Sequence, residues 1–261
     1  YCKGKFKTYL MKRVFITGAS SGIGKALALG YAKQKGIIGI CARRKTLLEK
    51  VATACRRYGA DIHLYNLDVR NSDDCKNVAK EFITKANGID CVIANAGIGG
   101  DDKLYSGSSD GINKILDTNI KGVTNTLMPF IPTMKQQKYG SLVCVSSVAS
   151  FFPLPFHGGY SASKIGIRMI LDSWRPSLSK YNIKATTICP GYVDTPMVKK
   201  AIFLPLKPVD TSARKFIMAI ERGEKTFIYP KYYKLFIYVY RIIPKRMYDF
   251  LIKKLFNRPT M

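Results

Sequence analysis

Short apolar runs alternate with helical patterns along most of this chain, and this alternation limits the folds available to it. The runs typical of strands are 13–17, 37–41, 62–66, 89–94, 141–146, 184–188 and 226–229. The helical patterns between them are 22–35, 45–58, 71–86, 109–136, 158–180 and 209–222. Strands that alternate with helices form a parallel sheet with helices on both faces. With 261 residues and no low-complexity linker, we expect one large α/β domain.

A glycine-rich turn, Thr17-Gly-Ala-Ser-Ser-Gly-Ile-Gly24, joins the first predicted strand to the first predicted helix. Gly18 permits a tight turn, Gly22 lets the backbone approach a ligand, and Gly24 lets helix and strand pack closely. The helix that follows offers its N–H groups and the positive end of its dipole to an anion. The turn therefore predicts a pyrophosphate site.

Tyr160 and Lys164 lie one helical turn apart in the pattern at 158–180, so they share a face of that helix. A phenol ordinarily titrates near pH ~10, and an ammonium group close to it favours the phenolate and lowers that pKa. We therefore expect the pair to act as a general acid and base near neutral pH.

Together these features resemble the short-chain dehydrogenase/reductase family over residues 12–225. The motifs that carry the resemblance stand in the family's order and at its spacing: Thr17-Gly18-x-x-x-Gly22-x-Gly24, Leu67-Asp68-Val69, Asn95-Ala96-Gly97, Asn119, Ser147, Tyr160, Lys164 and Pro190-Gly191-Tyr-Val-Asp-Thr195. Ser147 rather than Ser146 matches the family's serine, because it lies thirteen residues before the tyrosine. The resemblance implies a Rossmann-type, doubly wound parallel sheet with strand order 3-2-1-4-5-6-7.

The resemblance also implies a role for each residue of the site. Tyr160 exchanges a proton with the substrate oxygen, which Ser147 holds by a hydrogen bond. Lys164 also holds the nicotinamide ribose, and Asn119 holds a water that connects Lys164 to solvent. The catalytic set is Asn119, Ser147, Tyr160 and Lys164. The residues expected to bind the cofactor are Gly18, Ser20, Gly22, Ile23, Gly24, Arg43, Asp68, Val69, Asn95, Ala96, Gly97, Tyr160, Lys164, Pro190, Gly191 and Thr195.

The end of the second predicted strand indicates which nicotinamide cofactor is bound. An acidic residue there would accept the ribose hydroxyls of NAD, and none is present between Ile37 and Leu48. Arg43 can instead bind a 2′-phosphate, with Ser20 as a hydroxyl donor and Arg44 as a helper. The sequence therefore predicts NADP(H).

The number and spacing of the cysteines and histidines argue against a metal site. The chain has 7 cysteines and 2 histidines, with no Cys-x-x-Cys pair and no cluster of ligands. Buried, reduced thiols are the expected interpretation. His157 is expected to be a loop residue, with a place at the substrate mouth as the alternative. Ser147 lacks a recognisable histidine and acid partner, which argues against a hydrolase.

The net charge of +26, from 43 basic and 17 acidic residues, indicates attraction to a polyanion. No recognised nucleic-acid module is present, so we expect no specific nucleic-acid binding. No apolar run approaches the ~20 residues of a bilayer span, and no secretory signal is seen. We expect a cytoplasmic protein that is not secreted.

The last residues of the chain depart from the α/β pattern. Residues 225–261 hold nine Lys and Arg, one acid and ten Phe and Tyr. Within them, apolar and charged side chains recur on opposite sides of a helical pattern: Met247, Phe250, Leu251 and Leu255 against Lys245, Arg246, Asp249 and Lys253. A basic amphipathic helix of this kind favours an anionic membrane surface. The alternative is a helix that packs on its own domain or on a partner subunit.

Residues 192–208 contain three prolines and several large apolar residues. The family resemblance makes this stretch a lid over the substrate, and its apolar content suits an apolar substrate. A surface loop that packs on the body of the protein is the alternative.

The sequence thus predicts an N-terminal extension at 1–11, a Rossmann-fold domain at 12–230 and a basic, aromatic segment at 231–261. The leading hypothesis is a membrane-associated, NADP-dependent reductase of a lipid-like or other hydrophobic carbonyl compound, which forms a homo-oligomer. One alternative is a soluble reductase of small ketones whose C-terminal segment builds an oligomer interface. The other is a non-catalytic protein that kept the fold to sense nucleotides or bind nucleic acid.

Overall fold

The computed structural model describes residues 13–198 and 205–256. Within these residues one parallel sheet has the strand order β3-β2-β1-β4-β5-β6-β7, which confirms the predicted topology. Its strands are β1 (Arg13–Thr17), β2 (Ile37–Ala42), β3 (Asp61–Asn66), β4 (Cys91–Ala94), β5 (Gly140–Val145), β6 (Ile183–Pro190) and β7 (Thr226–Tyr229). The predicted extension at 1–11 lies outside the described residues.

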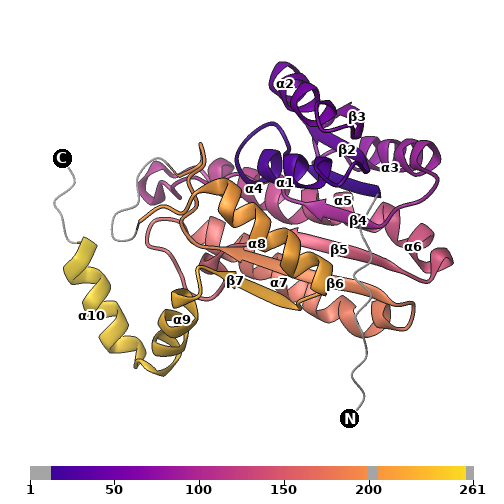
Figure 1. Ribbon diagram of the computed structural model, residues 1–261. Coiled ribbons are helices and arrows are strands. Elements are labelled where there is room, and N and C mark those ends of the chain that lie inside the picture. The colour runs from indigo at the N-terminus through magenta and orange to yellow at the C-terminus, as the bar shows by residue number, and fades with distance from the viewer. Residues whose placement is uncertain (1–12, 199–204, 257–261) are drawn as a thin grey trace, which may run out of the picture.

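Helices cover both faces of the sheet (Figure 1). One face carries α1 (Gly22–Ala32), α2 (Lys45–Arg56) and α8 (Val209–Arg222). The other carries α3 (Ser72–Ala86), α4 (Asp110–Leu116), α5 (Gly122–Leu127), α6 (Ile131–Gln137) and α7 (Gly158–Ser179). The strands and helices form one Rossmann-type domain, as predicted.

The single helix predicted for 109–136 is wrong in detail, because the structure interrupts it twice. A π-helical turn at Asp117–Lys121 separates α4 from α5, and it contains Asn119. Such turns are frequent at functional sites. A 3-10 turn at Met128–Phe130 separates α5 from α6, where Pro129 and Pro132 each lack the N–H that a continuous helix needs.

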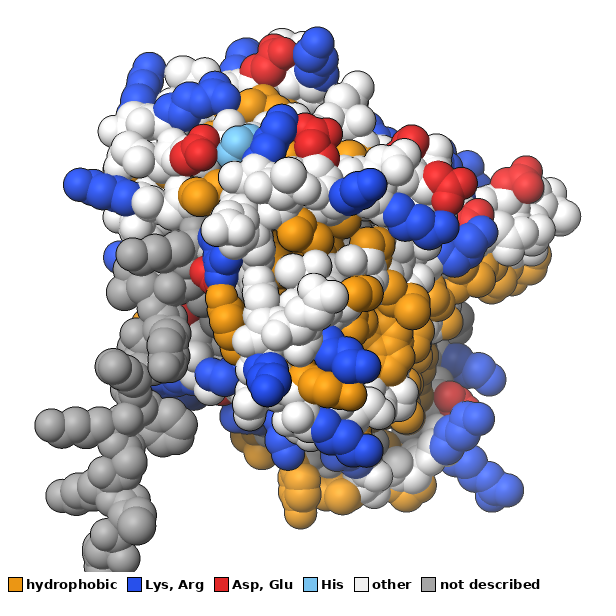
Figure 2. Space-filling model, turned by 90° about the vertical axis from the view of Figure 1, so that its right-hand side faces the viewer, with side chains coloured by type: hydrophobic (Ala, Val, Ile, Leu, Met, Phe, Trp, Pro, Cys, Tyr) orange, Lys and Arg blue, Asp and Glu red, His pale blue; other side chains and the backbone are white. Residues whose placement is uncertain are grey.

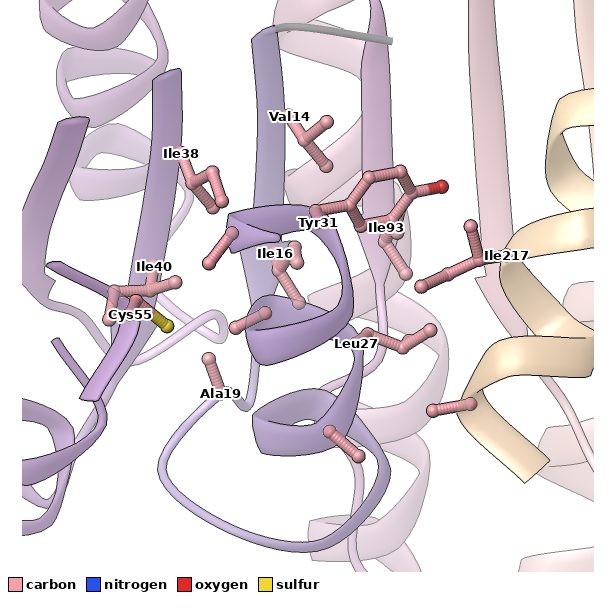
Figure 3. Close-up of a cluster of buried hydrophobic side chains, with 14 of the residues drawn as sticks. Val14, Ile16, Ala19, Leu27, Tyr31, Ile38, Ile40, Cys55, Ile93 and Ile217 are labelled. Atoms are coloured by element: carbon pink, nitrogen blue, oxygen red, sulfur yellow. The ribbon is translucent and has the colours of Figure 1, made fainter. Parts of the chain in front are cut away.

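The core forms two layers, one on each face of the sheet. Figure 3 shows the first layer, in which Ile16 of β1 and Ile93 of β4 face Leu27 of α1. In the second layer the ring of Phe15 lies 5.4 Å from that of Phe82 and 5.1 Å from that of Phe130, between centroids. Since neighbouring residues of β1 point to opposite, buried faces, the strand reads as a continuous apolar run.

The predicted buried thiols are confirmed for the described residues, where each cysteine is free and buried. Charge is spread over the surface: Figure 2 shows one face with Lys and Arg side chains at many separate points, and acidic side chains gathered toward its upper part. No helix within 13–198 and 205–256 has both the length and the apolar content to cross a bilayer.

Two helices end the described chain, α9 (Tyr232–Ile242) and α10 (Lys245–Phe256). They extend from the side of the sheet that β7 occupies (Figure 1). Tyr233 and Ile237 of α9 are buried in a small apolar cluster with Val148. Tyr248 of α10 donates a hydrogen bond from its hydroxyl to the carbonyl of Pro153, at 2.9 Å. The boundary at 230 and 231 stays a prediction.

Candidate active site

A cleft of about 500 Å³ opens at the carboxyl ends of the strands. It lies where the strand order reverses, since β2 follows β1 on one side and β4 lies on the other. Ligands of open parallel sheets bind at such a point. The predicted site residues that line it are Gly18, Ser20, Gly22, Ile23, Arg43, Asp68, Val69, Asn95, Ala96, Gly97, Ser147, Tyr160, Lys164, Pro190, Gly191 and Thr195. Gly24 and Asn119 lie behind its wall.

The glycine turn after β1 is held against the end of β4. Gly18 has a positive φ of 67°, and a Cβ atom there would lie 2.8 Å from the Cα of Ala96. The hydroxyl of Thr17 accepts the N–H groups of Asn95 and Ala96, both at 3.1 Å. The Asn95 amide donates in return to the carbonyls of Thr17 and Gly18. Asn95 therefore braces the turn, and Thr17, which the predicted site omitted, belongs to the same bracing.

Gly24 has the packing role that the sequence predicted. A Cβ atom at this position would lie 2.4 Å from the carbonyl oxygen of Gly18 and 2.5 Å from the amide nitrogen of Asn95. Any larger residue would therefore push α1 away from the turn.

An arginine reaches the first turn of α1. No side chain caps this helix at Ser21, so its first N–H groups face the cleft. Arg44 donates from Nη2 to the hydroxyls of Ser20 at 3.0 Å and Ser21 at 2.7 Å. Arg43 also lines the cleft. Arg43 was predicted to have the leading role, whereas the structure brings Arg44 into contact with the glycine turn and adds Ser21 to the site.

The segment after β3 lines the same part of the cleft. Asp68 forms an ion pair with Arg70, with 2.6 Å between Oδ2 and Nη2. The hydrogen bonds from Arg70 lower the pKa of Asp68, so its carboxylate is ionised. Because the negative charge of Asp68 is paired with Arg70, it cancels only part of the positive charge of Arg43 and Arg44.

Tyr160, Lys164 and Ser147 meet at the other end of the cleft. Burial raises the pKa of Tyr160, and a hydrogen bond with Ser147 only partly offsets this rise. The Nζ atom of Lys164 lies 5.7 Å from the centre of the Tyr160 ring and donates to the carbonyl of Val145 at 2.9 Å. The expectation that the pKa of the phenol is lowered is therefore wrong for this structure, because burial raises it.

Burial also lowers the pKa of Lys164 to about 8. The ammonium group is therefore mostly protonated at pH 7. It remains a cation that can hold a ribose hydroxyl or stabilise a phenolate.

The two adjacent serines have different surroundings. Ser146 is buried and donates from its hydroxyl to the carbonyl of Lys164 at 2.8 Å. Ser147 stands at the end of β5, where its hydroxyl accepts the N–H of Ala149 at 3.1 Å and donates to the carbonyl of Pro190 at 3.4 Å. Only the Ser147 hydroxyl is hydrogen-bonded with Tyr160, which supports the register chosen from the sequence.

Asn119 is fully buried and braces the loop after β4. Its Oδ1 accepts the N–H of Ile98, and its Nδ2 donates to the carbonyl of Ile98 and to the hydroxyl of Ser163, each at 2.9 Å. Ser163 donates in turn to the carbonyl of Tyr160 at 2.7 Å. The sequence missed Ser163, whose only signal is its place one turn after Tyr160. The water held by Asn119 stays a prediction.

Part of the predicted lid is described. Val193 and Lys207 form a parallel bridge, reinforced by a backbone hydrogen bond from Asp194 to Lys207 at 2.9 Å. Beyond this bridge, Pro196, Met197 and Val198 line the cleft, which supports the lid interpretation over a loop packed elsewhere. Residues 199–204 lie outside the described residues.

No group of three or more His, Cys, Asp and Glu side chains stands close enough to hold a metal ion in the described ranges, 13–198 and 205–256. The chemistry of the donors that line the cleft instead suits a dinucleotide. A Cβ atom at Gly97 would lie 3.1 Å from Oδ1 of Asn119 and 3.4 Å from Nζ of Lys164, so the chain leaves room beside Lys164.

Comparison with known proteins gives a consistent result. The model of a family described as short chain dehydrogenase matches residues 12–202. The chain is 32% identical to 3-oxoacyl-(acyl-carrier-protein) reductase FabG of Thermotoga maritima over 77% of this chain and 80% of the relative. It is also 32% identical to 11-beta-hydroxysteroid dehydrogenase-like 2 of Arabidopsis thaliana, over 96% and 83%. It is 28% identical to human 17-beta-hydroxysteroid dehydrogenase 13, over 89% and 79%.

Solved structures agree in fold. An alcohol dehydrogenase of the archaeon Thermococcus sibiricus, complexed with 5-hydroxy-NADP, superimposes with a TM-score of 0.76 at 25% identity, over 84% of this chain and 95% of that one. A short-chain type dehydrogenase/reductase of Mycobacterium marinum superimposes with a TM-score of 0.78 at 22% identity, over 83% and 93%.

Proposed function

Because the chain belongs to the short chain dehydrogenase family of NAD(P)-dependent oxidoreductases, we propose that it transfers a hydride between NADP(H) and a carbonyl or alcohol carbon of a hydrophobic substrate. One observation carries this proposal. The fold brings Ser147, Tyr160 and Lys164 together at one end of a cleft whose other end is a glycine turn beside two arginines.

Reduction of a carbonyl needs an electron pair at carbon and a proton at oxygen. When bound in the cleft, the nicotinamide cofactor would supply this electron pair as a hydride. Tyr160 gives its phenol proton to the carbonyl oxygen, and Ser147 donates a hydrogen bond that positions that oxygen. Lys164 stabilises the phenolate that remains until a solvent proton restores the phenol. Alcohol oxidation runs the same steps in reverse.

The chain has a fitting group for each part of NADP(H). The first turn of α1 and Gly22 suit the pyrophosphate, because a Cβ atom at Gly22 would lie 3.3 Å from the side chain of Thr195 and narrow the cleft. Arg43 and Arg44 stand where the 2′-phosphate is expected, after β2. Neither has an acidic neighbour on α2 before Glu49.

Arg43→Ala and Arg44→Ala are each expected to weaken NADPH far more than NADH. A charge-assisted hydrogen bond to phosphate is worth about 1.5–3 kcal/mol, or about 10–150-fold in affinity. Titration of each variant with both cofactors measures this preference. Lys45→Ala is the matched control, because it removes a neighbouring exposed charge outside the main cleft. If the parent protein binds NADH as tightly as NADPH, the assignment of NADP(H) fails.

An apolar substrate fits the open end of the cleft. Ile98, Pro196, Met197 and Val198 are apolar residues that line the cleft. The relatives named for hydroxysteroids and for an acyl carrier also act, by their names, on substrates with large apolar parts. NADPH oxidation with ketones of increasing chain length tests this point, and we expect kcat/KM to rise with length. A maximum at acetone would favour the alternative of a small-ketone reductase.

The surface of α9 supports the proposed association with an anionic membrane. Leu235, Tyr238, Val239 and Ile242 recur at spacings of three and four, and their side chains are 68%, 63%, 38% and 63% exposed. They form an apolar stripe on the side of α9 away from the docked residues Tyr233 and Ile237. Exposed basic residues accompany it on α9, at its N-cap and on α10: Lys231, Lys234, Arg241, Lys245 and Arg246.

Replacing the stripe by Leu235→Glu, Tyr238→Glu and Ile242→Glu together is expected to abolish flotation with vesicles that contain phosphatidylserine. Each cation near such a surface contributes about 1 kcal/mol, and insertion of the stripe adds to it. Salt should weaken binding of the parent without removing it, because screening acts on charge alone. These substitutions test the stripe alone. A deletion of residues 231–261 would also remove the buried Tyr233 and Ile237, and so could change the stability of the domain.

Met128→Glu is the matched control, because Met128 is exposed but lies on another part of the surface. Flotation that is equal in the parent and the triple variant contradicts the membrane proposal. If the parent stays with the buffer and the triple variant instead loses its oligomeric state in sedimentation, the stripe is a subunit interface.

A further inference from the structure

The helix that carries Tyr160 is capped by a residue from a distant loop. His157 stands at the N-cap position of α7, but its side chain does not cap the helix. Instead, the N–H of Gly158 donates to Oδ2 of Asp102 at 2.5 Å, and the N–H of Gly159 donates to Oδ1 at 3.0 Å. The carboxylate of Asp102 is buried, and it thus satisfies the first two N–H groups of α7.

The two glycines make room for this carboxylate. A Cβ atom at Gly158 would lie 3.0 Å from Oδ2 of Asp102. A Cβ atom at Gly159 would lie 3.2 Å from Oδ1 and 3.0 Å from a methyl group of Ile112. A carboxylate can reach the helix this closely only because both side chains are absent.

The loop that contains Asp102 is itself tied to the site. The loop begins at Ile98, whose N–H and carbonyl are both hydrogen-bonded to the side chain of Asn119. A Cβ atom at Gly99 would lie 3.8 Å from the Tyr160 ring, so this loop runs along the phenol. Its end is fastened by a hydrogen bond from the N–H of Asp102 to the carbonyl of Phe156, at 2.8 Å.

We propose that Asp102 is a positioning residue for the reaction. This proposal rests on the proposed function of Tyr160. Its carboxylate fixes the first turn of α7, and Tyr160 is the next residue after the two glycines it binds. A buried carboxylate is favourable here, because the N-terminus of a helix carries partial positive charge. Loss of the contact frees the first turn and lets the phenol move relative to Ser147 and Lys164.

Asp102→Asn is expected to lower kcat for ketone reduction by about tenfold to a hundredfold, since misplacement of a reacting group by about 1 Å can cost a hundredfold. The affinity for NADPH should fall much less than kcat, because the contacts expected for its pyrophosphate and 2′-phosphate come from the glycine turn and from Arg43, not from α7. Asp101→Asn is the matched control. Asp101 is exposed, with its Oδ1 3.2 Å from Nδ1 of His157, so this variant should keep the parent kcat.

Gly158→Ala separates positioning from stability. Alanine favours a helix over glycine by about 1 kcal/mol, which offsets the roughly 1 kcal/mol lost with the cap, so the melting temperature should stay close to that of the parent. The added methyl group nevertheless displaces the carboxylate, so kcat should fall as in Asp102→Asn. The double variant should be no slower than the slower single variant, because both changes break one contact.

An NMR measurement that does not depend on catalysis distinguishes the positioning role of Asp102 from the proposed function. In protein labelled with 3-fluorotyrosine, the Tyr160 resonance is the one lost in Tyr160→Phe. Asp102→Asn should shift or broaden this resonance, and Asp101→Asn should not. An unchanged resonance and an unchanged kcat overturn the proposal, and so does a loss of NADPH affinity as large as the loss of kcat. If the parent reduces no ketone but the resonance still responds, the proposed function fails and the positioning contact stands.

Discussion

Tyr160→Phe is expected to lower the rate of ketone reduction by about 10²–10⁴-fold, the usual contribution of a positioned general acid. The phenylalanine ring fills the same space but has no proton to give to the carbonyl oxygen. NADPH binding should be largely kept, because the glycine turn and the arginines after β2 are unchanged. Single-turnover rates and a fluorescence titration with NADPH measure the two effects separately. Activity within a few-fold of the parent would remove Tyr160 from its role.

The direction of the pKa shift adds a pH dependence to this prediction. Burial raises the pKa of Tyr160, so its phenol is protonated at neutral pH, which is the form that reduction needs. The rate of reduction should therefore hold at neutral pH and fall on the alkaline side, first as Lys164 loses its charge near pH 8 and then as the phenol ionises at higher pH. In Tyr160→Phe the part of the fall that comes from the phenol should be absent from the residual rate.

Ser147→Ala is expected to lower kcat by about 10²–10³-fold, as loss of one donor to a developing oxyanion does. Ser146→Ala should keep kcat within a few-fold, because the Ser146 hydroxyl already donates to the carbonyl of Lys164. Its cost should be in stability, about 1 kcal/mol for one hydrogen bond. Steady-state kinetics and thermal melting of both variants make the comparison. A more severe loss in Ser146→Ala would show that the wrong serine was assigned.

Periodicity was sufficient for the sheet and most helices, because the inner strands are buried on both faces and the helices that cover the sheet are buried on one. The strand predicted at 184–188 is longer in the structure, where β6 begins one residue earlier and ends two residues later, at Pro190. Of the two breaks in the helix predicted for 109–136, the one at 128–130 has a signal in the sequence, Pro129 and Pro132, but the π turn at Asp117–Lys121 has none. The pattern remains apolar on one face through the π turn, and only the structure shows the backbone widening around Asn119.

The spacing of motifs was sufficient to place most of the site in one cleft, but contacts between distant segments were not visible in it. Ser163 and Asp102 belong to no motif, and their partners lie far along the chain. Which of Arg43 and Arg44 contacts the glycine turn depends on how the chain turns after β2, and residue type does not specify this turn. The pKa of Tyr160 depends on burial, which spacing cannot give.

The C-terminal segment shows the same limit. The amphipathic pattern correctly predicted a helix that became α10, but it did not show how α9 docks. A Cβ atom at Gly191 would overlap the ring of Tyr233, at 2.1 Å from its Cε2. The aromatic residue of α9 thus packs on a glycine that lines the cleft. A pattern of residue types records that α9 is apolar, but not which of its faces meets the body.

The most direct test of the proposed function follows one hydrogen atom. The full chain is given NADPH with deuterium at the transferable position of the nicotinamide, together with a series of long-chain ketones. The proposal predicts alcohol that carries one deuterium at the carbinol carbon, formed by the parent and by Ser146→Ala but not by Tyr160→Phe. Alcohol without deuterium, or equal labelled alcohol from the parent and Tyr160→Phe, would contradict it.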